Sequence, residues 1–185
     1  KSKKELVTSR FSDEKSKQRI RIALANAYLG LGKTEKAKEQ VEMMVAAPIP
    51  VDYHSIVGGL HYNLGNYEKS IKTYEKLLLE EDVNLSERLD ILVNLVRGLS
   101  SNKELKKANT YIQTLKKLIK VNNPKNGREL ILKATGFVSQ KKKDFKSAVE
   151  IYEELLTVFE PSNETEITTT LFNLGYAYEE LGNFE

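Results

Sequence analysis

Two histidines are the residues whose type and spacing in this sequence come nearest to a reactive pair. His54 and His61 stand seven positions apart, which on an α-helix places both imidazoles on one face. Such a pair could bind a metal ion or act as acid and base. However, a later stretch of the sequence with the same pattern has Leu92 and Leu99 at the equivalent positions. We therefore interpret both as packed histidines and expect no metal site.

Other reactive side chains do not form a recognisable catalytic set. The chain has no cysteine, so disulfides and thiolate chemistry are excluded. The acidic runs at residues 80–82 and 153–154 are common on solvated helices and have no convergent partner. Gly58 and Gly59 lie inside a helical pattern, where they favour close helix packing over phosphate binding. The sequence therefore predicts a protein that is not an enzyme and uses no cofactor.

Charge is distributed unevenly along the chain. Residues 103–146 contain 13 Lys and Arg against 3 Asp and Glu, a balance of +10, whereas residues 147–185 contain no Lys or Arg and 9 Asp and Glu, a balance of −9. The basic segment could contact phosphates, but it has few aromatic residues on which bases could stack. We interpret it as offsetting the acidic segment or recruiting an acidic partner. A nucleic-acid-associated repeat using residues 103–146 is the less favoured alternative.

A repeated pattern indicates the elements that position these residues. Small residues recur with spacings of 33, 38 and 40, at Ala37, Ser70, Ala108 and Ala148. Large apolar residues follow each of them after four and seven positions, which is the stripe of an amphipathic helix. A second apolar stripe lies upstream of each small residue, so the pattern predicts helix pairs. No alternating β-branched run predicts a strand.

Turn residues separate the two helices of each predicted pair. Gly32, Gly65 and Gly182 stand where a helix would end in a left-handed cap, which glycine adopts without steric cost. The third and fourth pairs have residues 100–103 and 141–144 there and lack the glycine. Stretches with proline at residues 47–50, 122–124 and 160–162 mark the boundaries between pairs, because proline ends helices.

The pattern resembles the tetratricopeptide repeat, a two-helix unit of about 34 residues. The resemblance rests on the segments Leu24-Ala25…Tyr28…Gly32…Ala37, Leu174-Gly175…Tyr178…Gly182-Asn183-Phe184 and residues 65–74, and it covers roughly residues 18–185. It implies an all-α, right-handed α-solenoid of antiparallel helix pairs in a single domain over residues 1–185. The implied repeats are about 18–50, 51–84, 89–122, 129–162 and an incomplete 168–185. Residues 1–17 would be an N-terminal helix end or a partial repeat.

In this family the first helix of each pair lines a concave groove that suits an extended peptide or a helix. Asparagines there can bond a peptide backbone in both senses, and aromatic residues supply contact area. The equivalent positions of this sequence, our candidate partner-binding residues, are Arg19, Asn26, Tyr62, Asp90, Asn94, Arg97, Lys133, Phe137, Asn173 and Tyr176.

One subclass of the family binds the acidic C-termini of heat-shock chaperones through a clamp of Lys, Asn, Asn, Lys and Arg. The matching positions in repeats one to three hold Ile22, Asn26, Ile56, Asp90 and Asn94. Only Asn26 suits its role, and Asp90 would repel an acidic tail. We therefore do not predict a chaperone clamp.

The resemblance predicts a non-catalytic scaffold that binds a protein or peptide. Repeats lengthened toward 40 residues also resemble the peptide-sensing regulatory domains of larger bacterial proteins, which is an alternative within peptide binding. The longest aliphatic run is residues 77–79, so we expect no membrane span, and we expect a cytoplasmic protein.

The sequence stops inside a turn that would open another helix, so we expect a fragment of a longer protein. The last predicted helix, about residues 168–181, would then lack its pair. We expect an exposed apolar stripe on it that includes Leu174, Tyr178 and Leu181 and could support self-association.

Overall fold

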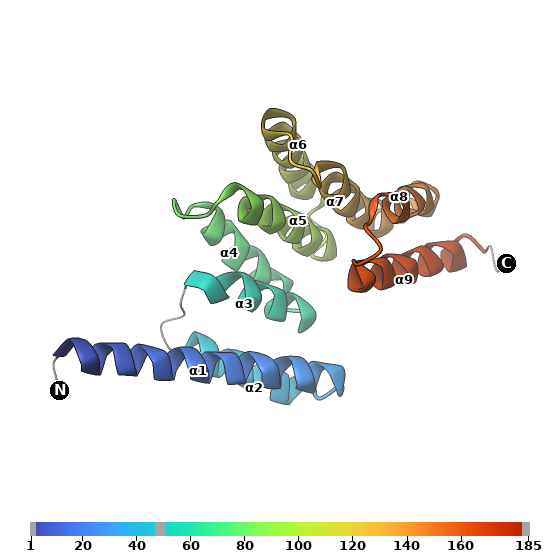
Figure 1. The fold of residues 1–185 in the computed structure, drawn as a ribbon. Helices are drawn as coiled ribbons and strands as arrows, with labels where there is room; N and C mark the ends of the chain where they lie inside the picture. The colour runs from blue at the N-terminus through green and yellow to red at the C-terminus, as the bar shows by residue number, and fades with distance from the viewer. Residues whose placement is uncertain (1–2, 47–50, 183–185) are drawn as a thin grey trace. The chain divides into compact units, whose positions relative to one another are not determined.

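The computed structural model of the chain describes residues 3–46 and 51–182, and all regular structure within these ranges is α-helix. The predicted all-α class of antiparallel helix pairs is confirmed (Figure 1). The helices in chain order are α1 (Lys3–Gly30), α2 (Thr34–Val45), α3 (Val51–Asn63), α4 (Tyr67–Leu78), α5 (Leu85–Ser101), α6 (Leu105–Asn122), α7 (Gly127–Lys141), α8 (Phe145–Val158) and α9 (Glu164–Glu180).

The helices fall into two compact units, residues 1–77 and residues 78–185. In unit 1, α1 packs along α2, and both contact α3. α1 continues without a break from Lys3 through the predicted start of the first repeat at residue 18. The core joins all three helices, because Ala25 of α1, Val41 and Met44 of α2, and Val57 and Leu60 of α3 form one buried cluster.

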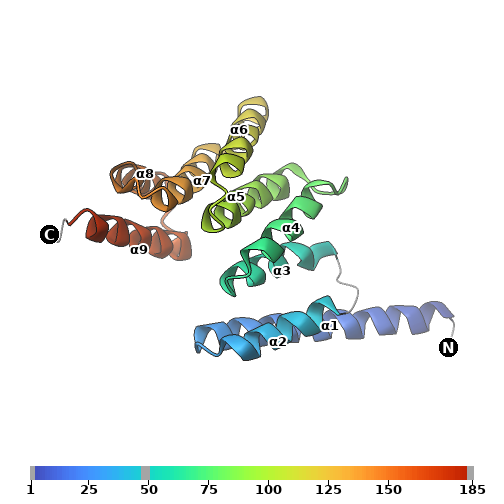
Figure 2. The same ribbon diagram turned by 180° about the vertical axis from the view of Figure 1, so that it is seen from behind.

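Unit 2 repeats the same scheme over two full pairs and a further helix. α5 packs against α6 and α7, α7 packs against α8, and α8 packs against α9 (Figures 1 and 2). α5 is covered along most of its length, with Leu92, Leu95, Val96 and Leu99 at most 1% exposed. The right-handed superhelical path and the single domain over residues 1–185 stay predictions.

The five turns share one backbone geometry, although two of them lack glycine. Gly32, Gly65 and Gly182 have φ of 67°, 74° and 73°, and Lys103 and Lys143 take the same left-handed place with φ of 64° and 62°. In the fourth repeat the Asp144 N–H donates to the Ser139 carbonyl, and in the first the Lys33 N–H donates to the Tyr28 carbonyl. This six-residue closure is the Schellman cap. The tertiary arrangement therefore imposes on lysine a conformation that glycine adopts at lower cost.

The recurring small residues lie where helices cross. Ala37, Ser70, Ala108 and Ala148 are all fully buried. The large residues four positions later, Val41, Tyr74, Ile112 and Tyr152, are at most 4% exposed. The repeat pattern thus located the core of each helix pair.

The two histidines behave as packed residues more than as a reactive pair. His61 is 6% exposed and its Nδ1 has no hydrogen-bond partner, while His54 is half-buried. Burial lowers the pKa of His61, and the nearby Lys69 ammonium lowers it further. Among the described residues, no group of three or more His, Asp or Glu side chains is placed to hold a metal ion. Within the same part of the chain, no helix combines the length and apolar character that crossing a membrane requires.

The apolar stripe expected on the last helix is wrong at two of its three residues. Leu174 and Tyr178 pack against the core cluster that α8 contributes to, and the Tyr178 hydroxyl bonds the Glu153 carboxylate. Leu181 is 40% exposed, as expected. The exposed large residues of α9 are instead Leu171, Phe172 and Tyr176. The register differs because Thr170, Leu174 and Ala177 form the side of α9 that faces α8.

Candidate peptide-binding face

The candidate residues divide between the two units. Arg19, Asn26 and Tyr62 belong to unit 1, and the other seven belong to α5, α7 and α9 of unit 2. These three helices are the first helices of successive pairs. We call the surface formed by Asp90, Asn94, Arg97, Lys133, Phe137, Asn173 and Tyr176 the first-helix face.

In unit 1 the candidates have different surroundings. The Arg19 Nε donates to the Tyr53 hydroxyl at 3.3 Å, which ties α1 to α3. Asn26 is exposed on α1, seven positions after Arg19 and so on the same side of the helix. Tyr62 lies against the ring of Tyr67, with 5.3 Å between the ring centroids. Arg19 and Tyr62 therefore support local packing, and Asn26 is the exposed member of the three.

In unit 2 direct contacts join the candidate residues across helices. The Arg97 guanidinium lies over the Phe137 ring at 5.7 Å, a cation–π contact between α5 and α7. The Lys133 ammonium contacts Glu129 at 2.7 Å on its own helix and Glu166 at 2.9 Å on α9. The first-helix face is therefore a connected surface over three helices.

Electrostatics at one end of this face is dominated by carboxylates. Burial acts against the charge of Lys133, but its hydrogen bonds to Glu129 and Glu166 leave its pKa raised. Desolvation raises the pKa of the Asp90 carboxyl, and the carboxylates of Glu129, Glu166 and Glu87 raise it further, against the lowering effect of Lys133. One ammonium thus faces several carboxylates, and the charge of Lys133 is already satisfied within unit 2.

The rest of the face is aromatic and carries free amides. Tyr176 is 40% exposed and packs edge-on against Phe145 of α8, with 6.0 Å between centroids. Asn94 and Asn173 are half-buried, and neither side chain has a hydrogen bond to another residue that the structure describes. An amide in this state offers both a donor and an acceptor to an incoming chain.

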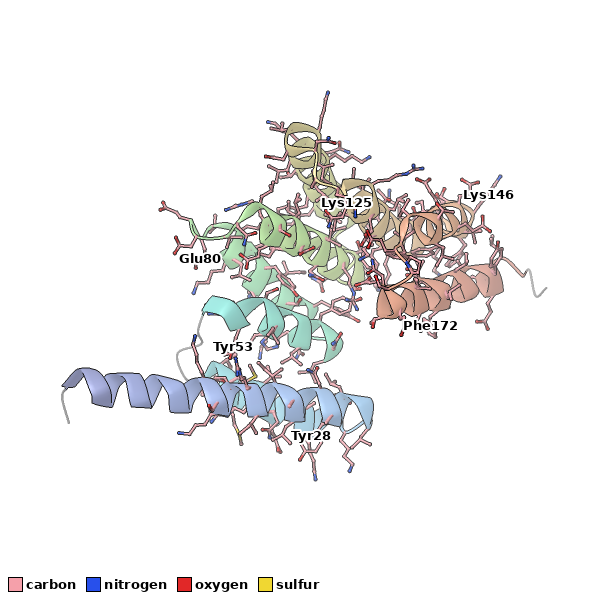
Figure 3. All side chains as sticks on the ribbon, in the orientation of Figure 1. Tyr28, Tyr53, Glu80, Lys125, Lys146 and Phe172 are labelled. Atoms are coloured by element: carbon pink, nitrogen blue, oxygen red, sulfur yellow. The ribbon has the colours of Figure 1, made fainter. Side chains whose placement is uncertain are left out.

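Sequence reasoning did not identify three residues of this surface. Glu129 and Glu166 complete the Lys133 cluster, and Phe172, labelled in Figure 3, is 77% exposed on α9. Phe172 stands in α9 where Lys133 stands in α7, since both precede a glycine by three positions, Gly175 and Gly136. Aligning the repeats on those glycines would have revealed it.

Contacts between the basic and acidic segments support the interpretation that one offsets the other. Lys125 contacts Glu160 at 2.7 Å, and Arg128 contacts Glu154 at 2.8 Å. With the Lys133–Glu166 pair, three cations of residues 103–146 bond carboxylates of residues 147–185. Other lysines of the segment, such as Lys116 and Lys117 on α6, are exposed.

The family assignment follows from the matched segments together with this geometry. The tetratricopeptide repeat model matches residues 18–42, which span the later part of α1 and most of α2, and residues 52–80, which span α3 and α4. These two segments of the chain are tetratricopeptide repeats. The expected family is thereby confirmed, and helix pairs of this family act in general as protein-interaction scaffolds. The same cap geometry and buried small residues continue through α5–α9.

Comparisons with curated sequences and with solved structures add little to this assignment. No curated protein sequence matches it. A solved structure of MamA AMB-1 is similar, with 17% sequence identity over 90% of this chain and 83% of that one, at a TM-score of 0.43.

Proposed function

We propose that the tetratricopeptide repeat chain is a non-catalytic scaffold that binds a segment of another protein across the first-helix face of unit 2. The observation that carries the proposal is the exposure of Phe172 and Tyr176 on α9, which also carries the free amide of Asn173, together with the free amide of Asn94 on α5. Exposed aromatic residues next to polar groups are typical of surfaces that a partner covers.

The chemistry of the face suits a polypeptide. Asn94 and Asn173 can each accept from a backbone N–H and donate to a backbone carbonyl, which fixes an extended chain without reading its sequence. Phe137, Phe172 and Tyr176 offer apolar area to partner side chains. The acidic end around Asp90 and Glu166 favours a partner with a cationic residue there. A peptide-sensing regulatory domain would use the same surface in the same way.

A binding experiment with a selected peptide tests the proposal. Peptides are selected by display on the immobilised chain, and the best binder is labelled for fluorescence anisotropy. The variant Asn94→Ala/Asn173→Ala/Tyr176→Ala should weaken binding by about tenfold or more, because loss of anchoring contacts on this scale costs more than ~1.4 kcal/mol. Circular dichroism checks that the variant keeps its helical content.

A matched control variant distinguishes the face from the basic helix. Lys116→Ala/Lys117→Ala removes two exposed charges on α6 and should leave peptide binding unchanged. A single-stranded RNA oligonucleotide is titrated in parallel at low and high salt. Tight, salt-sensitive RNA binding that the α6 variant abolishes and the triple variant preserves would replace the proposal with nucleic-acid association. Self-association and cytoplasmic residence stay predictions.

A further inference from the structure

The segment that joins α4 to α5 is acidic and exposed. Residues 79–84, which we call the acidic loop, contain Glu80, Glu81 and Asp82 in succession. Leu79 at the start of the loop is 83% exposed, and Glu81 and Asp82 are exposed as well. None of the three carboxylates bonds a cation among the residues that the structure describes. The loop therefore presents unpaired negative charge next to an exposed aliphatic side chain.

Hydrogen bonds hold the acidic loop against α5 on both sides of its charged residues. The Arg88 guanidinium donates to the Leu78 carbonyl at 2.8 Å and to the Glu80 carbonyl at 3.3 Å. At the other end of the loop the Asn84 side chain accepts from the Glu87 N–H at 3.0 Å and caps α5. The carboxylates are therefore positioned before a partner arrives, which lowers the entropy cost of binding.

The C-terminal end of α6 has the opposite charge. α6 contains five lysines and no Asp or Glu. Lys116, Lys117 and Lys120 are exposed, and none of them bonds a carboxylate within the described part of the chain. Val121 beside them is 75% exposed. We call these four residues the basic end of α6.

Repulsion within the basic end of α6 is not relieved by the acidic residues of its own segment. Its lysines stand three and four positions apart, where like charges destabilise a helix. The acidic residues of the segment 103–146 bond other groups, and they are Glu104, Glu129 and Asp144. A negatively charged surface placed on these lysines would therefore be held by Coulomb attraction.

The two charged surfaces lie at the same end of one helix pair. α5 and α6 pack together as an antiparallel pair, so the loop that precedes α5 lies at the same end of the pair as the last turns of α6 (Figures 1 and 2). A surface that has a positive part and a negative part is complementary to a copy of itself turned by 180°. The chain therefore carries both halves of a possible two-fold contact.

We propose that two copies of the chain pair through this end of α5 and α6, with the acidic loop of each copy on the basic end of α6 of the other. The dimer contains this contact twice, and in each contact three carboxylates face three ammonium groups, with Leu79 available to Val121. Because the surfaces are small, the dimer is weak, and its population depends on concentration and on salt.

Other occupants satisfy fewer of these groups. A phosphate backbone suits the lysines, but it leaves the acidic loop and the exposed side chains of Leu79 and Val121 without partners. The acidic segment 147–185 of a second copy is a poorer partner than the loop, because Glu154, Glu160 and Glu166 already bond cations of their own chain.

The inference goes beyond the proposed function. The first-helix face lies on α5, α7 and α9, and it includes no residue of the acidic loop or of α6. A dimer can therefore form whether or not that face binds a peptide, and either proposal can fail without the other.

Sedimentation equilibrium of the 185-residue chain tests the proposal. We expect a monomer–dimer equilibrium whose dissociation constant rises about tenfold or more between about 0.01 M and 0.15 M salt. The variants Lys116→Glu/Lys117→Glu/Lys120→Glu and Glu80→Lys/Glu81→Lys/Asp82→Lys each place like charges across both contacts, so each variant alone should be monomeric. A mixture of the two variants should form a heterodimer, because both contacts then join opposite charges again.

Two control variants separate this contact from general charge effects and from the first-helix face. Lys69→Glu/Lys72→Glu/Lys76→Glu changes the net charge by the same amount on α4 and should leave the dimer intact. Asn94→Ala/Asn173→Ala/Tyr176→Ala should leave it intact as well. Circular dichroism checks folding. The milder Lys116→Ala/Lys117→Ala/Lys120→Ala, in which alanine favours the helix, should weaken the dimer about tenfold or more.

Several results would overturn the proposal. One is a chain that stays monomeric at low salt up to its highest soluble concentration. Others are charge-reversed variants that still dimerise alone, or a mixture of the two that forms no heterodimer. A dimer that the Asn94→Ala/Asn173→Ala/Tyr176→Ala variant abolishes would overturn it too, by placing the interface on the first-helix face.

Discussion

Gly136 on α7 lies so close to the ring of Tyr152 on α8 that a Cβ at position 136 would stand 2.7 Å from the ring's Cε1. The tyrosine is 1% exposed and its hydroxyl bonds Gln140, so it has little room to move. We predict that Gly136→Ala lowers the free energy of unfolding by about 1–3 kcal/mol through overpacking. Urea denaturation followed by circular dichroism measures the change.

The matched control is Gly175→Ala on α9, where the added methyl meets open space. Alanine loses less backbone entropy than glycine in a helix, so this variant should gain about 0.5–1 kcal/mol. Equal effects of the two substitutions would contradict the difference in packing that separates α7 from α9.

Lys143 provides a second prediction because it holds a left-handed conformation with φ of 62° between α7 and α8. Lys143→Gly should raise the free energy of unfolding by about 1 kcal/mol, since the strain of a side chain in this region disappears. Lys142→Gly is the control, because Lys142 has φ of −76° and gains nothing from glycine. A stabilising Lys142→Gly and a neutral Lys143→Gly would show that the turn is formed differently.

The burial of His61 predicts that the folding stability of unit 1 depends on pH. Its pKa lies below the ordinary 6.5 because burial and Lys69 oppose its charge. The unfolded state therefore binds more protons than the folded state, and stability present above about pH 6.5 is lost as the pH falls toward the lowered pKa. His61→Leu, which places at this position the residue type of Leu99, should remove that part of the acid sensitivity. Urea midpoints at pH 7 and pH 5 measure it, and an unchanged difference between them would contradict the prediction.

The contacts of Lys133 predict that removing its charge lowers the folding stability of unit 2. Its side chain is 17% exposed and bonds two carboxylates. Lys133→Met leaves Glu129 and Glu166 without their cation, so it should cost about 1–3 kcal/mol at neutral pH. The loss should shrink as acid protonates the carboxylates. The pKa of Asp90 should rise further, because Lys133 is the group that lowers it. NMR titration of the Asp90 carboxyl checks this, and a fall in its pKa would contradict the assignment.

Sequence periodicity predicted the helix pairs because the repeated feature is the crossing of two helices. For α7 and α8 to pack together, residue 148 must be small and residue 152 large. Ala148 and Tyr152 meet these requirements, and both are buried as expected. The turn at Lys143 could be placed only by analogy, since its left-handed backbone is imposed by packing and is not encoded by a glycine.

The candidate site was less predictable because contacts between repeats decide which side chains are free. The pattern marked Lys133 as a groove residue, but Glu166, which satisfies its charge, comes from the next repeat along the chain. The stripe on α9 was assigned to Leu174 because the periodicity does not say which side meets α8. Phe172 was missed because no motif of the family requires an aromatic residue there.

The measurement that tests the central claim most directly is hydrogen exchange of the chain with and without a saturating display-selected peptide. Binding across the first-helix face predicts slower exchange in α5, α7 and α9, with peptides from α6 unchanged. The Asn94→Ala/Asn173→Ala/Tyr176→Ala variant should lose that protection. Protection confined to α6 and α8, or protection that the triple variant retains in full, would contradict the claim.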